Sequence, residues 1–299
     1  MNEKMRLNVK GIVPEKNFEI IGISYIGSPK SNTAMFITKK VENLLTALEN
    51  VSECLIFAEE GICVSDNLNE KHAFHFSKKP QLAYARFANV FAEARFIEER
   101  KLKYELSDSG YYYSCDVNIP KDAYIEPGCV IGPDVRIGKN ARILAGTVIK
   151  HTFIGDNFLS NEYAVIGANG FTMAEDEEGN KLRIPTLGRV IIGNNVEVGA
   201  HDNISGGSGG DTIIGDNVKI DALVHIGHDV HLFKNVEITA GAIIGGFDVL
   251  SDHAYIGINA VTRNRIKIGE RAIVGMGSTV TKSVEADKTV AGNPARLFK

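Results

Sequence analysis

The segment ALVHIGHDVHLF at residues 222–233 carries three of the chain's eight histidines, His225, His228 and His231. An imidazole, whose ordinary pKa is about 6.5, can remove a proton from an attacking amine or hydroxyl group at neutral pH. His228 is followed directly by Asp229, and a neighbouring carboxylate can orient the ring or support the imidazolium. The sequence therefore nominates His228 as a general base and Asp229 as its orienting partner.

A repeat of six residues determines where these histidines point. Eleven of the twelve positions at steps of six from Ile214 are aliphatic, and the exception is Thr262: Ile214, Ile220, Ile226, Leu232, Ile238, Ile244, Leu250, Ile256, Thr262, Ile268, Val274 and Val280. Earlier runs with the same period comprise Ile119, Ile125, Ile131, Ile137, Ile143 and Ile149, then Ile192, Val198 and Ile204. The period fits neither a helix nor simple alternation, but it fits a short strand followed by a corner. Three such strands form a triangular coil with the aliphatic side chains inside, which predicts a mainly β protein built as a parallel β-helix.

The repeat places the three histidines differently. His225 and His231 directly precede an inward aliphatic residue, so they should project from successive faces and cannot easily converge within one subunit. His228 falls near a corner, where side chains point outward. Gly246 follows His228 by eighteen residues, or one coil, so its backbone N–H should stack on the same edge. An unobstructed amide there is a plausible oxyanion donor for acyl transfer.

Two interruptions of the repeat and a non-repetitive beginning predict the domain organisation. Extra residues occur within residues 205–211, and a polar excursion runs from about residue 168 to 189; insertions in such folds loop outward and often line a binding site. Residues 1–110 mix strand-like and helix-like runs, which predicts a small α/β domain. The β-helix is expected over 111–289, followed by a C-terminal tail at 290–299.

Composition excludes several classes of protein. The chain has 33 Lys and Arg against 37 Asp and Glu and no block of like charge, which argues against a nucleic-acid-binding protein. No apolar stretch approaches the ~18 residues of a membrane-spanning helix, and the start lacks the apolar core of a secretion signal. We therefore expect a soluble, cytoplasmic protein. The four cysteines, Cys54, Cys63, Cys115 and Cys129, form no paired motif and are expected to be reduced.

Several motifs resemble a known family. IGANGF (166–171), IPTLGRVIIG (184–193), DTIIGDNVKIDALVHIGHDV (211–230) and SKKPQLAYARFANVF (77–91) closely resemble the UDP-3-O-acylglucosamine N-acyltransferases of lipid A (lipopolysaccharide) biosynthesis, a resemblance extending over nearly the whole chain. It implies a left-handed β-helix, a homotrimer with active sites between neighbouring prisms, and an acyltransferase that uses acyl carrier protein as donor.

The resemblance also implies roles for individual residues. His228 matches the family's catalytic base and Gly246 its oxyanion amide, while Phe36, Asn169 and Phe171 are the implied substrate-binding residues. No tightly bound cofactor and no metal are implied, because the acyl donor is a co-substrate. The acceptor is the amino group of a nucleotide-linked glucosamine.

Three departures from the family pattern keep the substrate open. The family's C-terminal helices, which dock acyl carrier protein, have no counterpart before the chain stops, and the ending NPAR resembles that of hexapeptide enzymes using acyl-CoA. Gly292 and Pro294 are therefore candidate donor-binding residues. Lys39 and Glu42 stand where the nucleotide-binding stretch of the family has Asn and Tyr. Asp229 replaces the usual Asn, and a His–acidic pair is more similar to bacterial nucleotide-sugar N-acetyltransferases.

The first hypothesis is thus an N-acyltransferase of a nucleotide-linked amino sugar, either the lipid A enzyme using 3-hydroxyacyl carrier protein or an acyl-CoA-dependent enzyme of another surface polysaccharide. A weaker alternative is a zinc-dependent enzyme resembling the γ-carbonic anhydrases, since imidazole is the usual zinc ligand. A third is a non-catalytic trimeric scaffold or sugar-binding module, in which the repeat supplies only shape.

Overall fold

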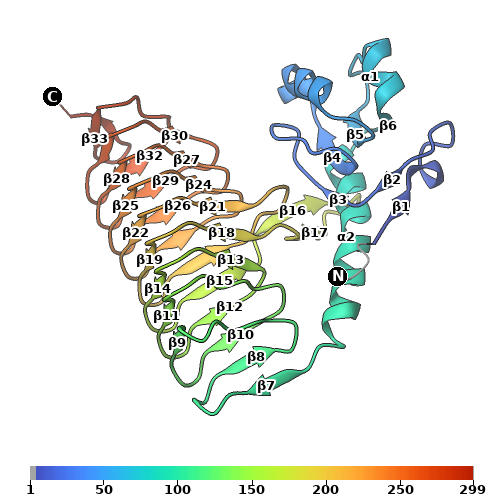
Figure 1. Cartoon of the computed structure of the whole chain (residues 1–299). Coiled ribbons are helices and arrows are strands. Elements are labelled where there is room, and N and C mark those ends of the chain that lie inside the picture. The colour runs from blue at the N-terminus through green and yellow to red at the C-terminus, as the bar shows by residue number, and fades with distance from the viewer. Residues whose placement is uncertain (1–4, 299) are drawn as a thin grey trace. The chain divides into compact units, whose positions relative to one another are not determined.

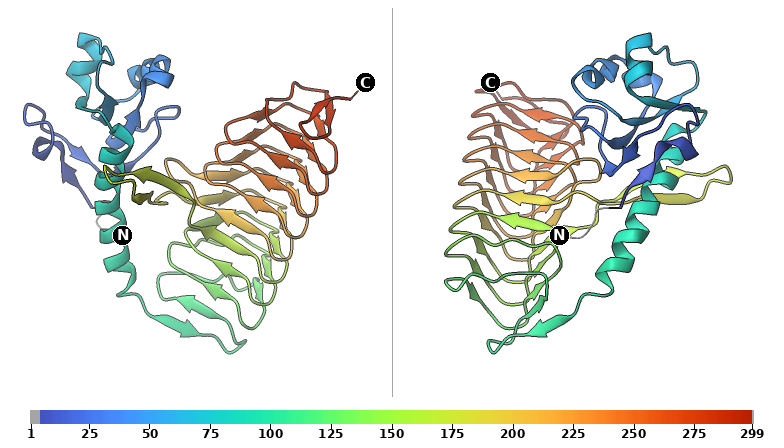
Figure 2. Two further views of the ribbon diagram at one scale, coloured as in Figure 1. Left: turned by 180° about the vertical axis from the view of Figure 1, so that it is seen from behind. Right: turned by 45° about the vertical axis from the view of Figure 1, so that its right-hand side comes forward.

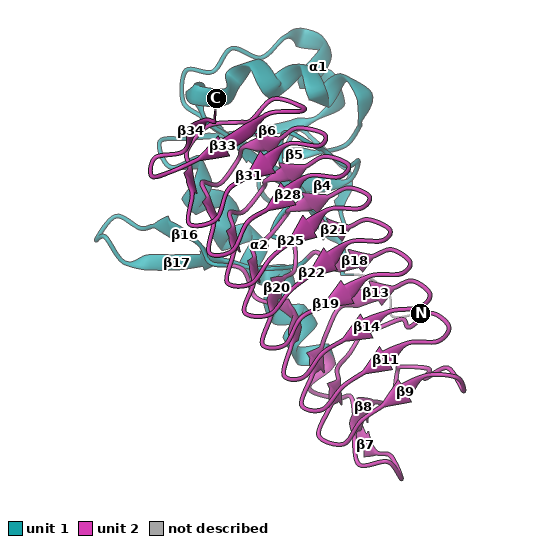
Figure 3. Cartoon of the chain, turned by 90° about the vertical axis from the view of Figure 1, so that its left-hand side faces the viewer, with its two compact units in different colours: residues 1–98, 171–187, 208–210 teal, residues 99–170, 188–207, 211–299 magenta. Residues whose placement is uncertain are grey.

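The computed structural model describes residues 5–298 and divides into two compact units, coloured separately in Figure 3. The α/β unit comprises the chain up to Glu98 together with Phe171–Leu187 and Ser208–Gly210. The β-helix unit comprises Glu99–Gly170, Gly188–Gly207 and Asp211–Lys299. The division between them along the chain therefore falls at Glu98–Glu99, before the expected boundary at residue 110.

The β-helix unit consists of three sheets whose short strands stack coil upon coil, as Figures 1 and 2 show. The first sheet contains, in order, β7 (Tyr104–Leu106), β8 (Tyr112–Ser114), β10 (Val130–Ile131), β12 (Val148–Ile149), β15 (Val165–Ala168), β20 (Asn203–Ser205), β23 (His225–Ile226), β26 (Ile243–Ile244), β29 (Val261–Thr262) and β32 (Thr279–Val280). The second contains β9 (Tyr124–Ile125), β11 (Arg142–Ile143), β14 (Leu159–Ser160), β19 (Glu197–Val198), β22 (Lys219–Ile220), β25 (Glu237–Ile238), β28 (Tyr255–Ile256), β31 (Ile273–Val274), β33 (Thr289–Ala291) and β34 (Arg296–Leu297). The third contains β13 (Thr152–Ile154), β18 (Val190–Ile192), β21 (Thr212–Ile214), β24 (His231–Leu232), β27 (Val249–Leu250) and β30 (Lys267–Ile268).

Pairing between coils is parallel and in register, except that the register of β15 against β20 shifts between Ile166 and Ala168. β23 pairs with β26 so that His225 lies beside Ile243 and Ile226 beside Ile244. The antiparallel pairs in these sheets are β7 with β8 and β33 with β34, at the two ends of the prism. Residues 290–299, expected as a tail, thus include part of β33 and the whole of β34.

The six-residue column forms the core of the prism, as predicted. All twelve positions from Ile214 to Val280 are buried, including Thr262, which is 4% exposed. Burying an aliphatic side chain of this size stabilises the fold by about 1.5–3 kcal/mol relative to leaving it in water. The repeat therefore specifies one continuous core, and a single polar side chain enters this column between Ile214 and Val280.

The corners depend on residues that tolerate a left-handed backbone. Asn157, Asn195, Asn217 and Asn235 all have φ values between 57° and 60°, a region that asparagine enters more easily than most residues. Their side chains also bond along the prism: the amide of Asn217 donates to the Oδ1 of Asn235 at 2.6 Å. The polar corners thereby add hydrogen bonds parallel to the strand pairing.

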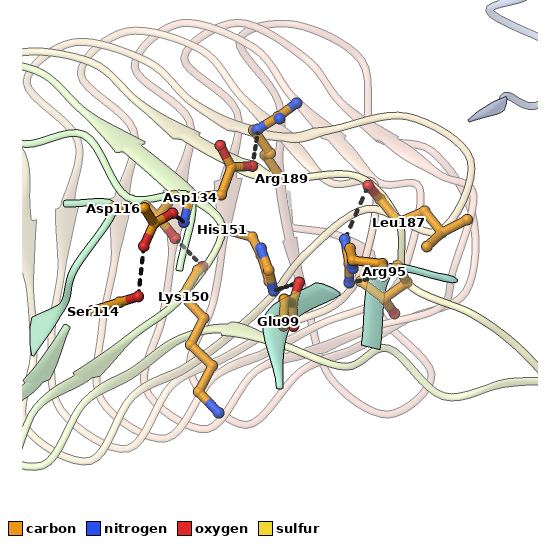
Figure 4. A network of polar contacts seen from close by, with 11 residues as sticks. Arg95, Glu99, Ser114, Asp116, Asp134, Lys150, His151, Leu187 and Arg189 are labelled. Carbon is orange, nitrogen blue, oxygen red and sulfur yellow. Dashed lines mark hydrogen bonds and ion pairs between the residues drawn. The ribbon is translucent and has the colours of Figure 1, made fainter. Parts of the chain in front are cut away.

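The long excursion returns to the prism at Arg189, which Figure 4 shows among its polar contacts. The Nε of Arg189 donates to the Oδ2 of Asp134 at 2.7 Å. The guanidinium groups of Arg136 and Arg189 lie 4.3 Å and 4.9 Å from the ring centroid of Phe153, a favourable cation–π arrangement. These contacts fix the point at which the chain re-enters the coil.

The α/β unit contains a parallel sheet and its helices. The sheet has the order β3 (Gly22–Ile23), β4 (Thr33–Ile37), β5 (Leu55–Glu59) and β6 (Ala73–Ser77). The helices are η1 (Val9–Gly11), η2 (Lys39–Asn50), α1 (Asp66–Lys71) and α2 (Pro80–Glu99), and β1 (Leu7–Asn8) pairs with β2 (Glu19–Ile20). The excursion contributes an antiparallel hairpin, β16 (Thr172–Glu175) and β17 (Lys181–Ile184), whose Ala174 and Ile184 join the same apolar cluster as Leu82 and Phe91.

No helix within residues 5–298 combines the length and the apolar character needed to cross a bilayer.

Candidate active site

The corner that follows β23 carries His228 and Asp229. The Nδ1 of His228 lies 2.8 Å from the Oδ2 of Asp229, and their side chains are 15% and 3% exposed. An ionised Asp229 can only accept this hydrogen bond, so Nδ1 carries the proton and Nε2 of the neutral ring keeps its lone pair. The pair thus has the geometry of a general base whose tautomer is fixed by its partner.

The backbone of Asp229 is fixed by a hydrogen bond to the preceding coil. Its backbone has φ 58°, and its N–H donates to the buried hydroxyl of Thr212, one coil earlier, at 2.9 Å. The carboxylate therefore stays beside His228 because the main chain that carries it is fixed.

The Nε2 side of His228 faces a glycine of the next coil. A Cβ atom on Gly246 would lie 2.9 Å from Nε2 and 3.1 Å from Cε1 of the ring. On the other side, a Cβ on Gly170 would lie 3.0 Å from the Cβ of His228. Any larger residue at position 246 would press on the nitrogen that must receive a proton, so the site requires glycine there.

The N–H of Gly246 has no assigned hydrogen-bond acceptor among residues 5–298. A Cβ on Gly227 would lie 2.7 Å from this nitrogen, so the absence of a side chain at position 227 also keeps the amide open. An open N–H beside a base is the arrangement that can stabilise the oxyanion of a tetrahedral intermediate.

Two further side chains extend this corner along the prism. Phe247 meets the His228 ring edge to face, with centroids 5.1 Å apart and planes at 88°. The guanidinium carbon of Arg265 lies 3.9 Å from the centroid of Phe247. The sequence reasoning missed both residues, although each lies one coil beyond its neighbour in the spacing already identified.

A buried polar pair lies behind the Gly246 turn, and sequence reasoning gave it no role. Asp248 is 0% exposed, and its Oδ2 accepts the hydroxyl proton of Thr262 at 2.5 Å. Burial raises the pKa of the Asp248 carboxyl to about 6, while hydrogen bonds from Ile266 and Thr262 act in the opposite direction. The available signal was Thr262 itself, the one polar residue in the inward column.

The three predicted substrate-binding residues, Phe36, Asn169 and Phe171, lie in different parts of the chain. Asn169 directly precedes Gly170, which contacts His228, so it lies next to the site along the chain. Phe36 is in β4 of the α/β unit, where its ring packs 5.2 Å from that of Tyr84. Phe171 belongs to the same unit, is 79% exposed, and lies 5.2 Å from the guanidinium of Arg183.

The predicted donor-binding residues Gly292 and Pro294 lie in the exposed turn between β33 and β34. The N–H of Gly292 donates to the hydroxyl of Ser278 at 3.2 Å. In the second sheet, β25, β28 and β31 separate β33 from β22, the strand of the His228 coil. The structure therefore does not bring these two residues to His228.

The other two histidines of the segment diverge, as predicted. His225 belongs to β23 of the first sheet and His231 to β24 of the third. Burial lowers the pKa of His225, and the neighbouring His228 lowers it further. Across residues 5–298, no three His, Cys, Asp or Glu side chains are grouped so that they could hold a metal ion.

A hollow of this unit lies elsewhere. It is open, measures about 570 Å³ and is lined by second-sheet residues that include Glu197, Lys219, Asp221 and Glu237. His228 and Gly246 do not line it, so the hollow and the candidate site are separate features.

Comparison with known proteins places this geometry in a chemical context. Residues 116–151 and 211–246 match the family described as bacterial transferase hexapeptide (six repeats). The chain is 39% identical over 152 residues to a UDP-3-O-acylglucosamine N-acyltransferase from Caulobacter sp. (strain K31), covering 51% of this chain and 44% of that protein. It is 38% identical over 139 residues to the enzyme of that name from Coxiella burnetii (strain Dugway 5J108-111), covering 46% and 40% respectively.

Solved structures support the same fold. The UDP-N-acetylglucosamine acyltransferase from Campylobacter jejuni superimposes with a TM-score of 0.58 and 26% identity, over 65% of this chain and 74% of that one. The predicted fold class, a left-handed parallel β-helix of hexapeptide repeats in a mainly β protein, is confirmed.

The resemblance to UDP-3-O-acylglucosamine N-acyltransferases is also confirmed, but it is narrower than expected. The chain spans less than half the length of these curated relatives, and the similarity covers about half of the chain. The acceptor, the donor and the assembly of this protein are therefore matters for proposal.

Proposed function

We propose that this protein is an N-acyltransferase that moves an acyl group from a thioester donor to the amine of a nucleotide-linked amino sugar. The observation that carries the proposal is the corner where Nε2 of His228 lies beside Gly246, whose N–H is open, while Asp229 holds Nδ1 at 2.8 Å. The names of the curated relatives, which are N-acyltransferases of an acylated UDP-glucosamine, support the choice of acceptor.

The reaction follows from the roles of these groups. As the amine nitrogen attacks the thioester carbonyl carbon, Nε2 of His228 takes the proton that the nitrogen loses. Negative charge collects on the carbonyl oxygen, where the Gly246 N–H stabilises it. The carbon–sulfur bond then breaks, and the imidazolium returns its proton to the departing thiolate. The products are an amide and a free thiol, and Asp229 stabilises the imidazolium between the two proton transfers.

The remaining parts of the proposal concern substrates and assembly. We propose that Phe36, Asn169 and Phe171 contact the nucleotide-linked sugar and that Gly292 and Pro294 contact the acyl donor. The donor acts as a co-substrate, either acyl-CoA or acyl carrier protein, without a tightly bound cofactor. Because a filled solenoid offers few concave sites of its own, we also propose a homotrimer, with the second wall of each site supplied by a neighbouring prism. Such an enzyme would work in the cytoplasm, where both donors occur.

The test is mass-spectrometric detection of N-acylated product. Short acyl-CoAs and 3-hydroxyacyl carrier protein are offered in parallel against UDP- and dTDP-linked amino sugars. We expect turnover with one donor–acceptor pair, its loss in His228→Ala, and its retention in the matched control His231→Ala, since His231 lies within β24 of the third sheet and not at the His228 corner. Full activity in His228→Ala would exclude the mechanism, and no product from any pair would exclude the function.

A further inference from the structure

The N–H of Gly245 departs from the regular pairing of the prism. At several other corners, the glycine after the inward aliphatic residue donates to the backbone carbonyl one coil further on. Gly227 donates to the carbonyl of Ile244 at 2.9 Å, and Gly257 donates to that of Val274 at 2.8 Å. Gly245 instead donates to the side-chain hydroxyl of Thr262 at 2.9 Å.

The hydroxyl that receives this hydrogen bond is held by a buried carboxylate. Thr262 donates its own proton to the Oδ2 of Asp248 at 2.5 Å. The other oxygen of Asp248 accepts the N–H of Ile266 at 2.9 Å. A hydroxyl has one proton to give, so the carboxylate fixes its direction and leaves its lone pair for Gly245.

This chain of hydrogen bonds ends one residue before the candidate oxyanion donor. The Gly245 N–H belongs to the Ile244–Gly245 peptide, and the next peptide, Gly245–Gly246, carries the Gly246 N–H. The carbonyl of Gly245 in that second peptide accepts the N–H of Asp248 at 3.3 Å, so the Thr262–Asp248 pair contacts both peptides. The buried pair lies inside the prism, with Thr262 4% and Asp248 0% exposed, so it has no access to substrate.

We infer that Thr262 and Asp248 are positioning residues that hold the N–H of Gly245 away from the regular ladder and thereby orient the Gly245–Gly246 peptide, so that the Gly246 N–H points at the site of oxyanion formation. The inference rests on the proposed acyl-transfer function, for which this amide is the oxyanion donor. Oxyanion donors act through preorganisation, so a small rotation of the peptide costs rate without changing substrate binding.

Asp202, a buried carboxylate at another corner, provides a comparison in which the role is structural. Asp202 is 1% exposed and accepts the N–H groups of Gly199 and Val224, each at 2.8 Å. It immediately precedes β20, at the corner that leads into the first sheet, whereas Asp248 lies at the corner that leads out of it. Both carboxylates support a turn, but only Asp248 is connected to the Gly246 peptide.

The experiment compares Thr262→Val, which keeps the shape and removes the hydroxyl, with Thr262→Ser, which keeps the hydroxyl. Valine suits this column, whose other members are aliphatic. We expect Thr262→Val to lower kcat by about tenfold or more with KM values for both substrates within about twofold, and Thr262→Ser to retain most of the wild-type kcat. Asp202→Asn, the matched control, should leave kcat unchanged even if it lowers Tm.

Crystal structures of the two Thr262 variants provide a readout that does not depend on activity. In the valine variant we expect Gly245 N–H to turn to the backbone carbonyl of residue 262, with displacement of the Gly246 nitrogen, whereas the serine variant should keep the wild-type peptide. An unmoved peptide in Thr262→Val, or an unchanged kcat, would overturn the inference while leaving the proposed function intact. Absence of acyl transfer by the unmodified enzyme would instead overturn the proposed function, and the crystallographic comparison would still decide whether the pair positions the peptide.

Discussion

Replacement of Gly246 by alanine tests the contact between the candidate base and the candidate oxyanion amide. The added Cβ would lie 2.9 Å, 3.1 Å and 3.3 Å from Nε2, Cε1 and Cδ2 of His228, well inside ordinary van der Waals separation. The ring cannot simply retreat, because Asp229 holds Nδ1 at 2.8 Å and a Cβ built on Gly170 would already lie 3.0 Å from the Cβ of His228. Either the imidazole or the Gly246 peptide must therefore shift by several tenths of an ångström.

The size of the kinetic effect follows from that displacement. A misplacement approaching 1 Å at reacting groups costs about 10²-fold in rate, equivalent to about 2.7 kcal/mol of transition-state stabilisation. Alanine is compatible with the backbone of such a corner, since Ala222 and Ala240 occupy the same position relative to Ile220 and Ile238. We therefore expect Gly246→Ala to fold normally and to lose about 10²-fold in kcat.

The assay is steady-state kinetics of N-acylated product formation, with thermal unfolding measured in parallel. Gly22→Ala is the control, because a Cβ at that position meets nothing within 4 Å. A Gly246→Ala enzyme whose kcat stays within about twofold of the wild-type value would refute the argument that His228 and the Gly246 amide react at this contact.

Three further predictions concern the His228–Asp229 pair, the apolar core of the prism and the pH dependence of stability. Asp229→Ala should lower kcat by at least tenfold, because it removes the carboxylate that fixes the Nδ1–H tautomer of His228 and stabilises the imidazolium; kinetics with unchanged Tm would confirm it. Phe158→Ala should lower the free energy of unfolding by about 3–5 kcal/mol, since the ring is fully buried in the prism; denaturant unfolding measures this. Burial raises the pKa of Asp202 from 3.8 to about 7, so the folded state binds the extra proton, and its contribution to stability should fall as pH rises from 4 to 7, by at most about 4 kcal/mol. The Asp202→Asn variant should not show this loss when its free energy of unfolding is measured against pH. Identical pH profiles for the variant and the wild-type protein would contradict the prediction.

The regular part of the fold was predictable because each coil repeats one local rule. An inward aliphatic residue every six positions, followed by a corner, leaves few ways to bury the apolar side chains. The same spacing placed His228 at a corner and Gly246 one coil above it, so the central contact of the candidate site followed from counting residues. The divergence of His225 and His231 followed in the same way.

Residues outside the repeat were harder to place. The spacing did not show where Gly292 and Pro294 lie. Because β33 and β34 continue the second sheet several strands beyond the His228 coil, a donor that contacts these residues must extend along the prism to reach His228. Gly170 received no role because the excursion breaks the six-residue register just before it, and spacing carries no information across such a break.

The sequence by itself determined the coil, its core and the stacking of His228 beneath Gly246, because strictly periodic burial is a local property of the chain. Only the tertiary structure decided which hydrogen bonds complete the site. Asp248 and Thr262 are fourteen residues apart, and nothing in the spacing shows that the hydroxyl replaces a backbone carbonyl at Gly245. The acceptor of the Gly245 N–H depends on the directions of individual lone pairs and protons inside the prism. These directions are fixed only when the coils pack against one another.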